Sequence, residues 1–123
     1  MLRGAAFAKD LYHEWPDEPR CGYLGWGGHG EKGILANIGM AHLYAILVTF
    51  GEYDEGIAGV SRSEALRRIE GVVRDCCYTH FSGSLACVDG DTWGGGWLDA
   101  SWSTVLAHTV GIVWAGLVAR ARE

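Results

Sequence analysis

Apolar residues dominate two stretches of the chain, and their pattern predicts two buried helices. Residues 34–50 and residues 101–118 contain no Asp, Glu, Lys or Arg, and apolar side chains would occupy every side of a helix at either place. A helix that is apolar all round is covered by other elements on all sides. We therefore expect both helices to lie in the core, the first of them ending at Gly51.

Residues 61–81 show a different pattern, which predicts an amphipathic helix. Ser61 followed by Glu64 fits a capping box, in which side chains satisfy the free backbone donors of a first helical turn. A stripe of Leu66, Ile69, Val73, Cys76 and His80 recurs at helical spacing. The remaining positions are predicted to face solvent, and they include Arg67, Arg68, Glu70, Arg74 and Asp75.

The other segments predict shorter structure and no strand. Residues 1–12 read as a short helix, residues 13–20 hold both prolines and read as a loop, and residues 52–60 form a polar connection. No stretch alternates as a strand would, so the predicted class is all-α. The order of buried, amphipathic and buried helix matches the inner and outer helices of an α/α-barrel, or toroid.

The number of helices also bears on the extent of the domain. One amphipathic helix and one short helix cannot cover two helices that are apolar all round. Residues 1–123 are therefore interpreted either as a single helical domain that forms a homo-oligomer or as a fragment of a larger α/α-toroid domain.

Two glycine-rich loops, 21–33 and 87–102, each precede one of the apolar helices. Glycine lets a backbone approach a ligand closely, aromatic faces stack well on sugar rings, and carboxylates accept hydroxyl hydrogen bonds or move protons. The loops therefore indicate a carbohydrate site, while the alternative is a pair of turns whose tryptophans pack on the core.

Three residues of these loops are candidates for catalysis. His29 and Glu31 lie in one glycine loop, where they could act as acid and base. Asp99 is the third candidate, and capping of the following helix is its alternative role.

Five further residues are candidates for holding a sugar. Aromatic stacking is predicted for the indoles, and hydrogen bonding to hydroxyls for the carboxylates, although core packing and turn formation are the competing roles. A hard cation such as calcium is another possible ligand of the two aspartates, without EF-hand spacing. These candidates are Trp26, Trp93, Trp97, Asp89 and Asp91.

The amino-acid composition limits the classes of partner that the chain is expected to bind. The net charge is −5 and no Lys/Arg-rich run occurs, which excludes a typical nucleic-acid-binding surface. Cys77, His80 and Cys87 could hold a metal, but the set lacks paired CxxC motifs, so buried reduced thiols are favoured and neither metal nor cofactor is predicted. Residues 1–12 lack a secretory signal pattern, and the localisation stays unknown.

Three motifs together resemble a known family. They are Gly-Trp-Gly-Gly-His-Gly-Glu-Lys-Gly at 25–33, Ser-Arg-Ser-Glu-Ala-Leu-Arg-Arg at 61–68, and Asp-Gly-Asp-Thr-Trp-Gly-Gly-Gly-Trp at 89–97. In this order the chain resembles part of a bacterial (α/α)-toroid carbohydrate-active protein, of the heparinase II/III-like or toroid glycosidase kind. The resemblance implies a polysaccharide gripped at one end of the toroid, and cleavage by a Tyr or His base in lyases or by carboxylates in glycosidases.

The leading hypothesis is thus a polysaccharide-processing or carbohydrate-binding protein, of lyase or glycoside hydrolase type. It requires the two glycine-rich loops to share a cleft at one end of the helices. The alternative is a non-catalytic helical assembly module. A small membrane protein is a third hypothesis, because residues 33–51 and 100–119 could span a bilayer, although their polar side chains argue against membrane insertion.

Overall fold

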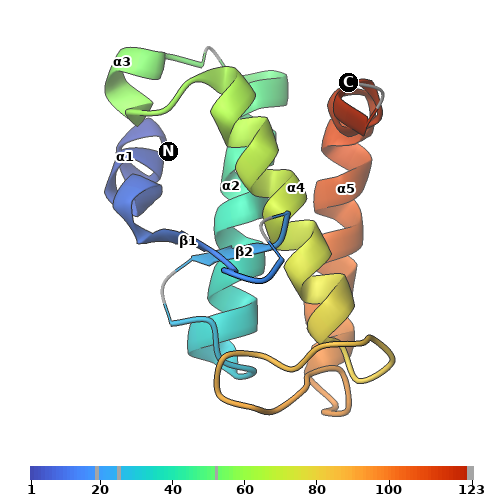
Figure 1. The fold of residues 1–123 in the computed structure, drawn as a ribbon. Helices are drawn as coiled ribbons and strands as arrows, with labels where there is room; N and C mark the ends of the chain where they lie inside the picture. The colour runs from blue at the N-terminus through green and yellow to red at the C-terminus, as the bar shows by residue number, and fades with distance from the viewer. Residues whose placement is uncertain (19, 25, 52, 122–123) are drawn as a thin grey trace.

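The computed structural model describes residues 1–18, 20–24, 26–51 and 53–121, and it is mostly helical, which confirms the all-α class. Three long helices lie side by side (Figure 1). In chain order the elements are helix α1 (Leu2–Ala8), turn η1 (Lys9–Leu11), strands β1 (Tyr12–Glu14) and β2 (Gly22–Leu24), π-helical turn η2 (Glu31–Leu35), and helices α2 (Ala36–Phe50), α3 (Glu55–Ala58), α4 (Arg62–Thr79) and α5 (Asp99–Ala121).

Helix α2 is the centre of the fold. Helices α4 and α5 both pack against it, and α1 also contacts it, so its apolar sequence is largely covered (Figure 1). Ile38, Ala41, Tyr44 and Ala45 of α2 are all buried. The prediction of a helix over residues 34–50 is therefore confirmed, and η2 extends its start back to Glu31. Its predicted burial on all sides holds only in part, because Ala36, Gly39, Thr49 and Phe50 are exposed.

Helix α5 is not buried all round, so that prediction was wrong. After the first turn of α5, Trp102, Thr109 and Val113 are buried, whereas Trp114 is 62% exposed. Helices α2 and α4 pack on one side of α5, and the short helices α1 and α3 lie beyond α2, far from α5 (Figure 1). The described chain thus has too few helices near α5 to enclose it.

Two helical stretches are long and apolar enough to cross a membrane, judged by length and composition alone. They are Glu31–Phe50, half of which is buried, and Asp99–Ala119, of which 17% is buried. Burial of the first stretch is typical of the core helix of a globular domain. The second stretch is mostly exposed, and its Trp114 side chain is 62% exposed.

A short hairpin has its strands at the two ends of the loop predicted over residues 13–20, the second of them within the predicted glycine-rich loop 21–33. Strands β1 and β2 pair antiparallel, with Glu14 opposite Gly22. Each strand has three residues, which is too short to show an alternating pattern. The ring of Tyr12 packs so closely over Gly22 and Gly71 that a Cβ on either glycine would collide with its hydroxyl.

Helix α4 begins at the predicted N-cap, but its buried face is rotated by about one residue relative to the predicted apolar stripe. Ser61 accepts a hydrogen bond from the Glu64 backbone N–H at 3.0 Å. Leu66 and Val73 of the predicted stripe are only half-buried. The buried positions on α4 are Ala65, Ile69, Gly71, Val72, Asp75, Cys76 and Thr79.

Burial of Asp75 contradicts its predicted place on the solvated face. Its carboxylate accepts hydrogen bonds from Trp15 Nε1 at 2.6 Å and from Asn37 Nδ2 at 3.2 Å. These contacts join the segment after β1, helix α2 and helix α4 at one point. Burial raises the pKa of the Asp75 carboxyl to about 6, and the two hydrogen bonds only partly oppose that shift.

Candidate functional site

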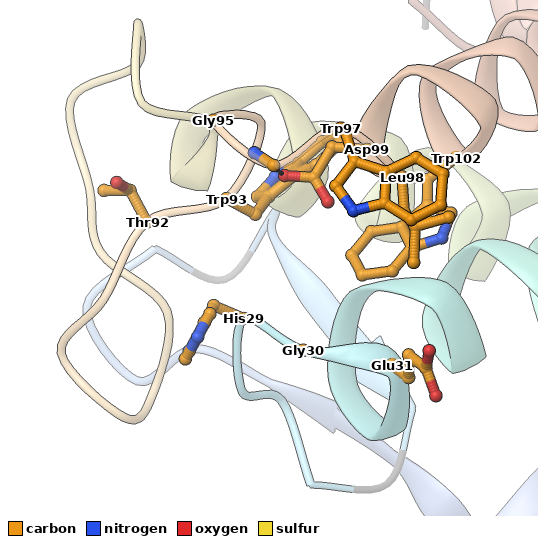
Figure 2. Close-up of a pocket in the computed structure, with 11 residues that line it drawn as sticks. His29, Gly30, Glu31, Thr92, Trp93, Gly95, Trp97, Leu98, Asp99 and Trp102 are labelled. Atoms are coloured by element: carbon orange, nitrogen blue, oxygen red, sulfur yellow. Dashed lines mark hydrogen bonds between the residues drawn. The ribbon is translucent and has the colours of Figure 1, made fainter.

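The two glycine-rich loops lie together at one end of the long helices (Figure 1). The Val88 backbone N–H donates to the Gly27 carbonyl at 3.2 Å and joins them directly. Between them lies a cavity of about 510 Å³. The shared cleft required by the carbohydrate hypothesis is therefore present. Its walls, shown in Figure 2, are formed by His29, Gly30, Glu31, Thr92, Trp93, Gly95, Gly96, Trp97, Leu98, Asp99 and Trp102.

Backbone hydrogen bonds fasten the second loop to the end of α4. The Trp93 N–H donates to the Thr79 carbonyl at 3.3 Å, and the Phe81 N–H donates to the Trp93 carbonyl at 2.8 Å. At Gly94 the backbone has φ of 103°, and a Cβ there would collide with the ring of His80. Glycine is therefore required at this position, where the loop turns toward α5.

Asp99 holds the same loop from the start of α5. Its Oδ2 accepts the backbone N–H groups of Gly94 at 2.7 Å and of Gly96 at 2.9 Å, and the residue is 9% exposed. It is the first residue of α5, so it lies close to the N-cap position that its alternative role requires. This geometry gives Asp99 a structural task, and its catalytic role stays a prediction.

His29 pairs with a residue that sequence reasoning did not select for it. Its Nδ1 donates to Asp89 Oδ2 at 2.6 Å, and its backbone N–H donates to the same oxygen at 3.1 Å. The expected partner, Glu31, is exposed at the start of η2, and Figure 2 shows the two side chains on different sides of Gly30. No sequence signal marks the His29–Asp89 contact, because the residues are 60 positions apart.

The charges of this pair are mutually stabilised. The hydrogen bond to the Asp89 carboxylate raises the pKa of His29. For Asp89, desolvation acts to raise the pKa, but hydrogen bonds from His29 and from the Asp91 backbone outweigh it and lower the pKa. The imidazolium form of His29 beside an ionised Asp89 is thus favoured, and Asp91 Oδ2 lies 3.7 Å from the same ring nitrogen.

The predicted stacking tryptophans have three different environments. Trp97 is 87% exposed and borders the cavity. Trp93 also borders it but is 4% exposed, and its Nε1 donates to the Cys76 carbonyl at 2.9 Å, which favours core packing. Trp26 lies outside the cavity wall, and its exposed ring covers Gly28. Among the three, Trp97 is therefore the one that is both exposed and part of the cavity wall.

Besides the loop glycines, three wall residues were not among the candidates selected from the sequence. Thr92 carries no distinguishing pattern, but Leu98 and Trp102 have the spacing of neighbours on one helical face. On a helix, that spacing places the Trp102 side chain next to Leu98, at the end of the second glycine-rich loop. Trp102 is 8% exposed, and it connects the cavity wall to the hydrophobic core.

The thiols are poor candidates for a metal centre. The four cysteines are free, and Cys21, Cys76 and Cys87 are buried as predicted, whereas Cys77 is exposed. Burial raises the pKa of the Cys21 and Cys87 thiols to about 11 and also raises the pKa of Cys76 well above its ordinary value, so they stay protonated at neutral pH. Within the described ranges, the one group of three potential ligands is formed by His29, Asp89 and Asp91.

Comparisons of the chain with protein-family models, with curated proteins and with solved structures found no match. The fold and the site are therefore interpreted from their own geometry.

Proposed function

We propose that the chain binds carbohydrate in the cavity between its two glycine-rich loops. The observation that carries this proposal is the indole of Trp97, which is 87% exposed and borders a cavity that also contains Glu31 and His29. Ligand sites are typically cavities lined by aromatic side chains together with a few polar groups. Sugar rings present flat C–H faces to such indoles and hydroxyls to the neighbouring polar groups.

The size and lining of the cavity support the same class of ligand. Its volume of about 510 Å³ lies within the range of small-molecule pockets, about 300–1,000 Å³. The Glu31 carboxylate accepts hydrogen bonds, and the Thr92 hydroxyl both donates and accepts them. Gly30 and Gly95 add backbone without side chains, and a Cβ at either position would have no heavy atom within 4 Å. A short stretch of polysaccharide fits this combination.

A finer proposal is that the chain is part of an (α/α)-toroid that cleaves the bound polymer. Helix α4, with its charged face, lies in the sequence between α2, which carries no charged residue, and α5, which carries none over residues 101–118, as an outer helix would lie between two inner ones. His29 and Glu31 border the cavity, which is where a lyase or glycoside hydrolase needs its proton-transfer groups.

Tryptophan fluorescence during titration with acidic and neutral oligosaccharides tests the binding proposal. We expect a saturable change with one class of sugar. Trp97→Ala should weaken that binding about tenfold, because the loss of one stacked ring face costs roughly 1.4 kcal/mol.

Trp114→Ala is the matched control, because Trp114 is also exposed, at 62%, but lies on α5 outside the cavity wall. It should leave the titration unchanged. Absence of a saturable change with every sugar, or equal weakening by both variants, would contradict the proposal. New reducing ends or unsaturated products in the same samples would establish cleavage.

The exposed surface of α5 favours a second candidate function, that of a helical assembly module. Its uncharged residues leave one side of the helix in water, with Trp114 as the largest exposed side chain. A second copy of the chain presents the same uncharged face and could cover it by an isologous contact. Measurement of the mass in solution tests this candidate.

A further inference from the structure

Three potential metal ligands meet where the two glycine-rich loops touch. His29 comes from the first loop, and Asp89 and Asp91 come from the second, about 60 residues later. One ligand atom from each lies within 4.8 Å of the other two. The set combines one imidazole nitrogen with carboxylate oxygens, so it is more than a patch of negative charge.

The separations suit the coordination sphere of a small divalent cation. Metal–ligand bonds of about 2.1 Å place neighbouring ligand atoms about 3.0 Å apart in an octahedron and about 3.4 Å apart in a tetrahedron. His29 Nδ1 lies 2.6 Å from Asp89 Oδ2 and 3.7 Å from Asp91 Oδ2. These two distances lie on either side of those values, and the ligand atoms of Asp89 and Asp91 lie within 4.8 Å of each other. Rotation of the exposed Asp91 side chain toward Asp89 would admit the ion.

The surroundings orient one ligand and leave the other two accessible. The Asp89 carboxylate accepts backbone N–H groups from His29 at 3.1 Å and from Asp91 at 3.2 Å, which fixes its direction. The side chains of His29 and Asp91 are 46% and 72% exposed. A cation and its remaining water ligands therefore have an open path to the position between them.

We propose that His29, Asp89 and Asp91 bind a divalent cation of the Mn²⁺ or Zn²⁺ kind. Imidazole nitrogen suits Zn²⁺ and related transition metals, and carboxylate oxygen suits Mn²⁺, whereas Ca²⁺ prefers oxygen ligands alone. The ion takes the place of the proton on His29 Nδ1, and that proton is released to solvent. Since His29 also borders the cavity, the ion lies beside it, with its open positions available to water or to a ligand oxygen.

Mn²⁺ is the sharpest probe, because thiols bind Zn²⁺ well and Cys77 is exposed. Titration of the whole chain with MnCl₂, followed by loss of the EPR signal of free aqueous Mn²⁺, should show one bound ion per chain. Asp91→Asn and His29→Gln should each weaken this binding at least tenfold. Asp91→Asn is the more stringent variant, since the hydrogen bond from its backbone N–H to Asp89 is retained.

Asp17→Asn and His13→Gln are the matched controls, because both residues are exposed and lie outside the three-ligand group. They should leave the Mn²⁺ affinity unchanged. Absence of Mn²⁺ binding, or equal affinities in all four variants, would overturn the inference and reduce the group to an ion pair that fastens the loops. No sugar is present in these samples, so the outcome does not depend on the proposed carbohydrate site.

Discussion

At the scale of single residues, Asp75 shows how much depends on neighbours that lie far away in the sequence. The helical pattern placed it on a solvated face, yet Trp15 and Asn37 enclose it. The carboxylate is satisfied by two donors, but removal from water still favours its neutral form. This residue therefore links the stability of the fold to pH.

We expect Asp75→Asn to change the pH dependence of the unfolding free energy. The folded pKa of about 6 exceeds the ordinary value of 3.8, so the folded state binds the proton more tightly. The stability contributed by this group is complete below about pH 4 and falls as the pH rises to about 6, by roughly 3 kcal/mol in all.

In the Asp75→Asn variant this fall should be absent when urea denaturation is measured from pH 4 to pH 7. Other carboxylates titrate in the same window, so the quantity to compare is the difference between the variant and the parent chain. Asp17→Asn changes the same charge at an exposed position and should preserve the parent curve. Parallel curves for Asp75→Asn and the parent would show that Asp75 does not retain its proton.

The site residues also show the limit of reasoning from single positions. His29, Glu31, Trp93, Trp97 and Asp99 were selected because of their residue types and their loops, and the structure places all five around one cavity. Their individual environments were not predictable. Whether a ring is buried, as in Trp93, or left in water, as in Trp97, depends on which helix passes behind it.

At the scale of elements, the helix ends follow local chemistry closely. Ser61 accepts the Glu64 N–H at the predicted start of α4, and Gly51 follows the predicted end of α2. These signals work because a helix end must satisfy its own free backbone groups, and the residues that do so are adjacent in the sequence. The three-residue strands lacked such a signal, and β2 packs against α4, which is far away in the sequence.

Ser61→Ala should lower the free energy of unfolding by about 1 kcal/mol, because the first turn of α4 loses a side-chain acceptor for its backbone N–H groups. The midpoint of urea denaturation measures this loss. Ser63→Ala is the control, since Ser63 is exposed in the same helical turn and alanine favours helix there. Equal midpoints for the two variants would show that the cap contributes nothing.

At the scale of the whole molecule, the dominant feature is that too few helices surround the two long apolar helices to bury both of them. Half of the stretch that contains α2 is buried, whereas only 17% of the stretch that contains α5 is buried. The exposed side of α5 consists largely of small and polar residues, with Trp114 as its large apolar side chain. The number of helices in the sequence predicted that one apolar helix would stay partly exposed. The structure identifies α5 as that helix.

We expect the purified chain to form dimers through α5, with a mass near 27 kDa by light scattering, twice the 13.3 kDa of one chain. Ala107→Glu should shift the mass toward that of the monomer, because it places a charge on the exposed side of α5. Ser63→Glu adds the same charge at an exposed position on α4 and should leave the dimer intact. A monomeric parent chain at millimolar concentration would exclude this contact.

The sequence by itself determined the helical class, the approximate extents of the long helices and the two loops that carry the candidate chemistry. These follow from periodicity and from capping groups, which are properties of neighbouring residues. Only the tertiary structure decided that His29 pairs with Asp89, that Asp75 is buried and that α5 stays exposed. Those outcomes depend on which elements pack together, because burial and pairing join residues that the chain itself keeps far apart.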